Sequence, residues 1–333
     1  MIDFRYHLVS LISVFLALAV GIILGAGPLQ NAIGDQLTDQ VEALRVERTA
    51  LRDSLTEAQV TLDEQSAYAL AAGAELVEGS LQDVRVAVVD VGKVSGTREA
   101  EVVSQLEAAG ARVVAQSSMT EAWTSAGDAV LRGTVADGQR GQLDGMVEDD
   151  ATTAQVLGTV LGVALTEADG EGSESRSTRA VELYQLLSQV GLVDSRFAPS
   201  APAEAVLLLS AGIEEEGVES TESSEVPEDV DEVGAVLAMQ AAAGTVVVAG
   251  PTVAEGDLVS ALRSDEAATG VLSTVSGLEQ EVMRLNVPLA LAAQYVGEVG
   301  QYGFEDDAVV VPPAVDLADR AATGTDGTDG EGS

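Results

Sequence analysis

An uncharged run of 19 residues from Leu8 to Ala26 constrains the fold of this chain more than any other feature. Twelve of these residues are Leu, Ile, Val or Phe, and only Ser10, Ser13 and small residues interrupt them. As a helix rising about 1.5 Å per residue, the run can cross the roughly 30 Å hydrocarbon core of a bilayer. Each large apolar side chain favours insertion by about 0.3 to 0.6 kcal/mol. The sequence therefore predicts a transmembrane anchor over residues 1–34.

The flanks of this run predict its orientation. Arg5 lies on the short N-terminal side with Tyr6 and His7, whereas the first charges after the run are Asp35 and Asp39. Basic residues favour the cytoplasmic side, so we expect a cytoplasmic N-terminus and a C-terminal domain outside. Arg5, Tyr6 and His7 are the predicted membrane-interface residues; for His7 the alternative is a metal ligand, although one imidazole cannot form a metal site. The alternative for the whole run is a cleaved signal peptide, which normally has a shorter apolar region and an A-x-A-like site.

Leucines recur every seven residues after the apolar run. The repeat consists of Leu37, Leu44 and Leu51, with Val41, Leu55 and Leu62 at the companion positions. Such heptads are typical of a coiled coil, so residues 35–80 are predicted to form an oligomeric stalk. The alternative is an amphipathic helix that packs on its own domain.

Residues 81–318 are predicted to form a layered α/β domain with a mainly parallel sheet. Short Val-rich runs alternate with helical stretches, beginning with the strand Arg85–Val91, a helix over about 97–109 and a strand over 112–116. Further strands are expected over 205–209, 245–249 and 270–275, and further helices over 152–165, 178–190, 233–243 and 278–295. Ten carboxylates and no basic residue lie between Glu214 and Glu232, so 213–232 is expected to be an acidic loop. Residues 319–333 are expected to be a disordered tail.

Composition excludes several classes of function. The chain of 333 residues carries 55 Asp and Glu against 16 Lys and Arg, a formal net charge of -39, which would repel nucleic acid. It has no Cys, which excludes disulfides, zinc ribbons and thiolate nucleophiles. Aromatic residues make up 3%, which offers little for stacking on sugars. Membrane lipid and other copies of the chain are the partners we expect, with an envelope protein as a further candidate.

No catalytic or cofactor site is predicted. The turn VDVGKVSG after the first strand matches neither the P-loop pattern nor G-x-G-x-x-G, so Lys93 is interpreted as an exposed turn residue. Asp90 at the carboxyl end of that strand is the best candidate for a catalytic carboxylate, but such an Asp more often caps the next helix. The methionines Met119, Met146, Met239 and Met283 are scattered in the sequence, without the short spacing of a thioether copper site. Metal-binding residues are therefore unknown.

Both ends of the chain resemble the MctB family, described as copper transport outer-membrane proteins of mycobacteria and related actinobacteria. The R-Y-H block at 5–7, the segment VFLALAVG at 14–21 and the Leu-Gly pair at 24–25 match the family's N-terminal pattern. The stretch VLSTVSGLEQEVMRLNVPLALAAQ and the later GQYG at 300–303 resemble its C-terminal region.

The resemblance implies a role in copper efflux or homeostasis, with copper as a transported ion and outer-membrane channel activity as a family attribute. A single apolar helix cannot form a pore alone, so a channel would need several chains or another protein. The leading hypothesis is a single-pass envelope protein, not an enzyme, that takes part in copper transport. The alternatives are a non-transport envelope scaffold and a cryptic hydrolase that uses carboxylates such as Asp90.

Overall fold

The computed structural model describes residues 4–26, 28–143, 145–212 and 231–317, and the chain divides into two compact units. The first unit is Met1–Ala67 and the second is Tyr68–Ser333. Residues 213–230 of the expected acidic loop and residues 319–333 of the expected tail lie outside the described residues. Asp231 and Glu232 are described, and they cap and begin helix α7 instead of continuing the loop.

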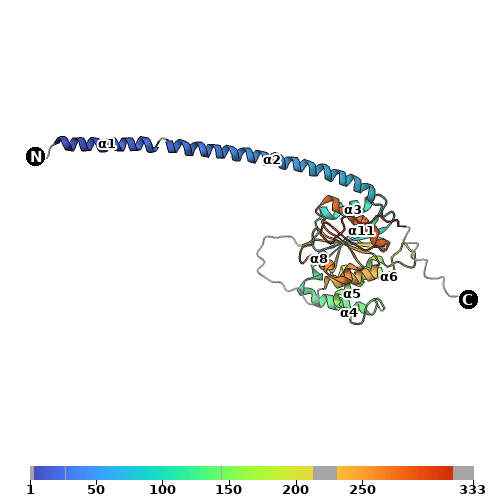
Figure 1. Cartoon of the computed structure of the whole chain (residues 1–333). Helices are drawn as coiled ribbons and strands as arrows, with labels where there is room; N and C mark the ends of the chain where they lie inside the picture. The colour runs from blue at the N-terminus through green and yellow to red at the C-terminus, as the bar shows by residue number, and fades with distance from the viewer. Residues whose placement is uncertain (1–3, 27, 144, 213–230, 318–333) are drawn as a thin grey trace. The chain divides into compact units, whose positions relative to one another are not determined.

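The described part of the first unit is α-helical. Helix α1 spans Phe4–Ala26, and α2 spans Pro28–Val77 and continues into the second unit (Figure 1). Within the described residues, one helix is long and apolar enough to cross a membrane; its span, Phe4–Ile23, has 20 residues, and none of it is buried. The expected apolar helix is therefore present. Pro28 stands at the first position of α2, where its missing N–H costs no hydrogen bond.

The heptad leucines of α2 are exposed. Leu37, Leu44, Leu51, Leu55 and Leu62 all have more than half of their side-chain surface accessible. Charged residues such as Glu42, Arg45 and Glu47 lie between these leucines and are also exposed. The described part of the chain therefore leaves this apolar stripe uncovered, and the coiled coil stays a prediction.

The second unit is built on a seven-stranded sheet in the order β3-β2-β1-β4-β5-β6-β7. All neighbouring strands are parallel except β3, which runs antiparallel to β2. The strands are β1 (Arg85–Val91), β2 (Arg112–Met119), β3 (Val193–Phe197), β4 (Ala205–Ser210), β5 (Val246–Ala249), β6 (Ser273–Val275) and β7 (Gln301–Tyr302). The predicted mainly parallel sheet is confirmed.

Helices cover both faces of this sheet (Figure 1). One core lies between the sheet and α4 (Ala129–Arg140), α5 (Thr153–Thr166), α6 (Thr178–Gln189), α7 (Glu232–Ala243), α8 (Leu258–Ser264) and α9 (Glu266–Thr269). The other lies under α3 (Gly96–Ala108), α11 (Asn286–Tyr295) and the end of α2, and the short helix α10 (Glu281–Arg284) comes just before α11. Two 3₁₀ turns, Glu121–Trp123 and Ala126–Asp128, precede α4. Strand β1 serves both cores, since Ala87 and Val89 face one and Val86 and Val88 face the other.

One expected helix is divided in two. The sequence predicts a helix over 278–295, whereas the structure has α10 followed by α11, which begins at Asn286. Pro288 explains the division. It has no N–H to donate to the carbonyl four residues earlier, and its ring crowds that carbonyl, so a helix cannot continue through it without a break. Pro is tolerated in the first turn of a helix, which is where α11 places it. The prediction of one continuous helix was wrong for this reason.

Candidate functional site

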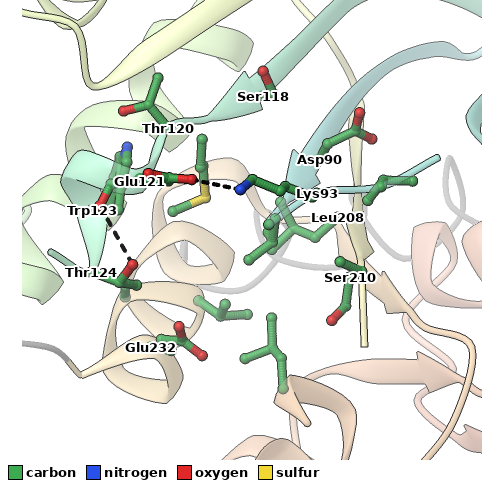
Figure 2. A pocket seen from close by; sticks show the side chains of 18 of the residues that line it. Asp90, Lys93, Ser118, Thr120, Glu121, Trp123, Thr124, Leu208, Ser210 and Glu232 are labelled. Carbon is green, nitrogen blue, oxygen red and sulfur yellow. Dashed lines mark hydrogen bonds and ion pairs between the residues drawn. The ribbon is translucent and has the colours of Figure 1, made fainter. Parts of the chain in front are cut away.

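A cavity of about 630 Å³ opens at the carboxyl ends of β1, β2 and β4 (Figure 2). The chain passes from β1 to β2 on one side, and later strands are added on the other side of β1, beginning with β4. In an open α/β sheet, this reversal separates the loops that follow the two central strands and leaves a crevice there. The cavity therefore lies where the topology alone would place a binding site.

The β1–α3 turn positions the first polar residues of the cavity. Gly92 adopts φ +78, a conformation that glycine enters without strain, and the chain then turns into α3. Ser95 caps this helix by accepting a hydrogen bond from the Arg98 amide. Asp90 is therefore not the cap of α3, and the interpretation of Asp90 as a capping residue was wrong.

Asp90 is a buried carboxylate with an unsatisfied oxygen. Its side chain is 8% exposed, and Oδ1 has no hydrogen-bond partner. The pKa of Asp90 is raised from 3.8 to about 7; burial is the largest cause, nearby Glu99 contributes to the rise, and Arg196 opposes it. Near neutral pH this carboxyl group therefore exists in both protonation states.

The cationic residues of the cavity already have partners. Arg196 approaches Glu99 to 2.8 Å. Lys93 approaches Glu121 to 2.9 Å, as Figure 2 shows. Arg132 is buried and donates hydrogen bonds to two backbone carbonyl groups before α4. Lys93 is exposed, as the sequence predicts, and its partner is a carboxylate.

An apolar wall forms the other side of the cavity. It consists of Trp123, Leu157, Leu208, Val236 and Met239, which all belong to the core beneath α5 and α7. Asp90 lies two residues after Val88, so it belongs to the opposite face of β1. The cavity therefore reaches from one face of the sheet to the other across the strand ends.

Metal-binding chemistry is sparse here. The described ranges contain no group of three or more His, Cys, Asp or Glu side chains arranged to hold a metal ion. Met119 and Met239 both line the cavity although 120 positions separate them in the sequence. The sequence positions of these two methionines do not indicate that they are close, because only the sheet topology brings β2 and α7 together.

The predicted interface residues occupy the other unit. Arg5, Tyr6 and His7 lie in the first turns of α1, where all three are exposed. No contact in the structure tests their proposed role at a membrane surface. The sequence prediction named these residues and missed the cavity, apart from Asp90.

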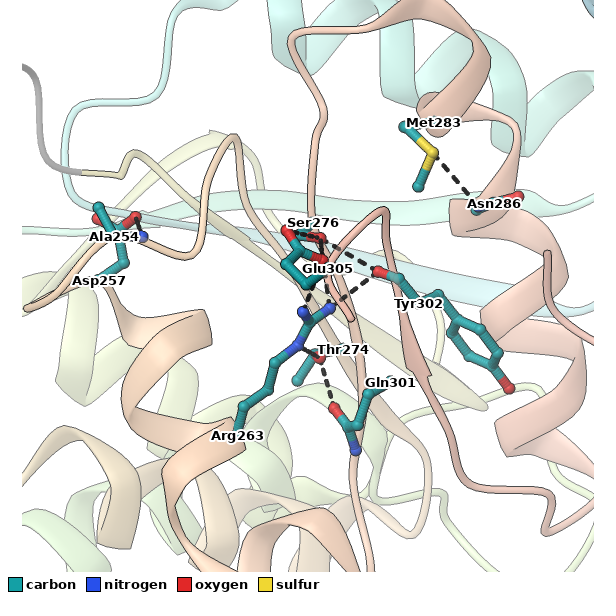
Figure 3. Close-up of polar contacts among 10 residues, drawn as sticks. All are labelled: Ala254, Asp257, Arg263, Thr274, Ser276, Met283, Asn286, Gln301, Tyr302 and Glu305. Carbon is teal, nitrogen blue, oxygen red and sulfur yellow. Dashed lines mark hydrogen bonds and ion pairs between the residues drawn. The ribbon is translucent and has the colours of Figure 1, made fainter. Parts of the chain in front are cut away.

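A second polar cluster ties the end of the sheet together (Figure 3). Arg263 of α8 donates to the Tyr302 carbonyl at 2.9 Å and to Glu305 at 2.9 Å, and it also donates to Thr274 at 2.8 Å. Burial opposes ionisation of Glu305, but Arg263 and Ser276 hold its pKa below the usual value. With every polar atom of Arg263 used in this way, the cluster stabilises the fold and leaves no open binding position.

Together these features define a protein with an N-terminal apolar helix of membrane-spanning length, a long helix after it and a doubly wound α/β domain with a crevice at the strand ends. The chain belongs to the MctB family. The family model, described as "Copper transport outer membrane protein, MctB", matches residues 1–313.

Curated relatives of similar length accompany this match. Proteins named "Copper transporter MctB" from Mycobacterium bovis and from two strains of Mycobacterium tuberculosis are 25% identical to this chain over 327 residues. The alignments cover 93% of this chain and 99% of each relative. The similarity thus extends over both compact units.

Proposed function

We propose that this protein takes part in copper efflux or copper homeostasis as a membrane-anchored envelope protein. The observation that carries the proposal is the family match over residues 1–313. It is supported by relatives that are named copper transporters and that align with this chain over nearly their whole length. In this proposal copper is the cargo, and the chain has no enzymatic role. Direct tight binding of Cu(I) is disfavoured by the absence of Cys and by a single His in the sequence.

The test is the copper content of cells that lack the gene. We expect deletion to raise cellular copper and copper sensitivity, and the full chain to restore both. A chain with Leu16→Arg and Leu18→Arg should fail to restore them, because each Arg costs about 2.5 to 3.5 kcal/mol at a helix centre. Unchanged copper content and sensitivity after deletion would remove the copper proposal.

The anchor is proposed to place the N-terminus in the cytoplasm and the α/β domain outside. The position of Arg5 before the apolar helix supports this orientation. The chain has no Cys, so a single engineered cysteine reports its own location. Asp149→Cys, at an exposed turn, should react with an impermeant maleimide on intact cells, whereas a cysteine added before Met1 should react only after lysis. The opposite pattern would overturn the orientation, and separating the membranes by density would tell inner from outer membrane.

The channel role is proposed for an oligomer. Each chain offers one apolar helix of spanning length in its described part, so a pore would need several copies or another protein. The exposed heptad leucines of α2 support association between copies. The same exposed stripe also favours the second candidate function, an envelope scaffold that oligomerises and recruits a partner. Normal copper handling together with a reproducible crosslinked envelope partner would favour the scaffold.

A further inference from the structure

The charges in the cavity at the strand ends are unevenly balanced. Six carboxylate side chains line it, Asp90, Glu99, Glu121, Asp231, Glu232 and Asp257, against the three cations Lys93, Arg132 and Arg196. Each cation already has partners within the protein. An anionic ligand would therefore meet no available positive group and would be repelled by the excess of carboxylates.

Among the described residues that line the cavity, Asp90 is the one with a buried polar atom that has no hydrogen-bond partner. Two of the other carboxylates cap local structure: Asp231 accepts from the Gly234 amide at 2.7 Å, and Asp257 accepts from the Ala254 amide at 3.0 Å. Asp90 Oδ1 has no such partner, although its side chain is more than nine-tenths buried. A buried carboxyl group that is short of hydrogen-bond donors destabilises the fold, and a ligand that donates a hydrogen bond to the accessible part of this carboxyl group would offset that cost.

The apolar wall indicates what the rest of the ligand must be. Leu157, Leu208, Val236 and Met239 present carbon and sulfur atoms, and Trp123 adds an aromatic ring. A hydrated metal ion would gain nothing from such a wall, and the described residues hold no cluster of three metal-ligating side chains. A cavity of about 630 Å³ lies within the range that encloses small organic molecules.

We propose that this cavity binds a small organic cation, with its apolar body against the α5–α7 wall and its ammonium group donating to Asp90. The ammonium group would supply both the missing hydrogen-bond donor and the missing positive charge at the strand ends. The proposal concerns the α/β domain and does not depend on copper transport.

The chain contains its own reporter for this test. Trp123 is the single tryptophan of the sequence, and it lines the cavity, so tryptophan fluorescence reports on this position. The full-length protein, held in lipid nanodiscs, is titrated with cyclohexylmethylamine, with the neutral cyclohexylmethanol and with the anion cyclohexanecarboxylate. Empty nanodiscs correct for partition into lipid, and thermal unfolding provides a second readout of binding.

We expect saturable binding of the amine, at least tenfold tighter than that of the alcohol or the carboxylate. Asp90→Asn should remove this preference and leave amine and alcohol within about threefold of each other. Asp137→Asn, the same change at an exposed position of α4 outside the cavity, should keep the preference. The comparison of three probes on the unmodified protein stands even if the Asp90 variant does not fold.

Three outcomes with the amine would overturn the proposal, and so would one with the carboxylate. They are no saturable binding of the amine by either readout, equal affinities for the amine and the alcohol in the unmodified protein, and a preference for the amine that persists in a folded Asp90→Asn variant. A tighter association of the carboxylate would also refute it, since it would show that the unbalanced carboxylates do not control selection.

Discussion

Asp90 shows how one residue can have a role that its sequence context does not reveal. It follows a run of valines at a strand end, which is equally typical of a capping residue. The structure instead buries it beside Glu99 and leaves Oδ1 without a partner. Burial depends on how the whole domain packs around the strand end, and this is why the local sequence could only nominate Asp90 as a candidate.

The raised pKa of Asp90 predicts a pH-dependent stability. Because the folded-state pKa, about 7, exceeds 3.8, the folded protein retains a proton that the unfolded chain releases, so stability is lost as pH rises across that interval. Asp90→Asn removes this titration. Relative to the unmodified protein, the variant should gain about 1 to 3 kcal/mol in free energy of unfolding between about pH 5 and about pH 8. Denaturant unfolding at several pH values checks this, and a pH-independent difference would contradict it.

Arg263 is predicted to be essential for stability. Its side chain is 5% exposed and contacts β6, β7 and Glu305 at once. Arg263→Met should cost about 3 to 5 kcal/mol, because it removes the cation that pairs with Glu305 and leaves Ser276 as the remaining donor to Glu305 and to the Tyr302 carbonyl. Arg112→Met, which removes an exposed pair with Glu174 at 3.9 Å, should change stability by about 0.5 kcal/mol or less. Thermal unfolding of both variants gives the comparison, and equal effects would refute the assignment.

At the scale of elements, α5 and α7 form the most extensive contact between two elements of the described chain. Gly158 of α5 lies so near α7 that an added Cβ would stand 2.0 Å from the Ala235 carbonyl oxygen. Backbone cannot yield as a flexible side chain can, so the two helices depend on this glycine for their spacing. The cavity depends on it too, since Leu157 and Val236 beside this contact form part of the apolar wall.

Gly158→Ala should therefore destabilise the protein by about 2 to 4 kcal/mol, through overpacking of α5 against α7. Gly138→Ala in α4 is the matched control, because its added Cβ meets nothing within 4 Å and the position is exposed. That control should be neutral or stabilise the helix by up to about 1 kcal/mol. Denaturant unfolding of the two variants gives the free energies of unfolding to compare. An unchanged free energy for Gly158→Ala would show that the helices can separate at low cost.

Sequence patterns predicted elements best where local periodicity and burial agree. Strands β1, β4 and β5 are continuous apolar runs, as buried parallel strands require, and the expected ranges match the observed ones closely. Strand β3 was not predicted, because Val193–Phe197 contains Asp194, Ser195 and Arg196 and lies at an edge with one side exposed. The cavity could not be predicted, since its walls come from segments whose proximity is set by strand order.

At the scale of the whole molecule, the exposed stripe of α2 leads to a prediction about assembly. In a parallel coiled coil, Leu51 would face its counterpart in a second chain, whereas Asp53 would point outward. Leu51→Cys should therefore form a disulfide-linked dimer under mild oxidation, and Asp53→Cys should not. The chain has no other Cys to confuse the result on a non-reducing gel. Equal crosslinking at both positions, or none at Leu51→Cys, would contradict the stalk.

The two ends of the sheet have a consequence for how copies of this chain can meet. Strand β7 is two residues long, and β3 carries Asp194 and Arg196 on its edge. Short or charged borders give an incoming strand few backbone groups to pair with, which is how many β-containing proteins avoid fibrillar growth. Self-association by strand addition is thereby discouraged at both borders. Copies that associate through α2, as proposed, would therefore keep their sheets separate.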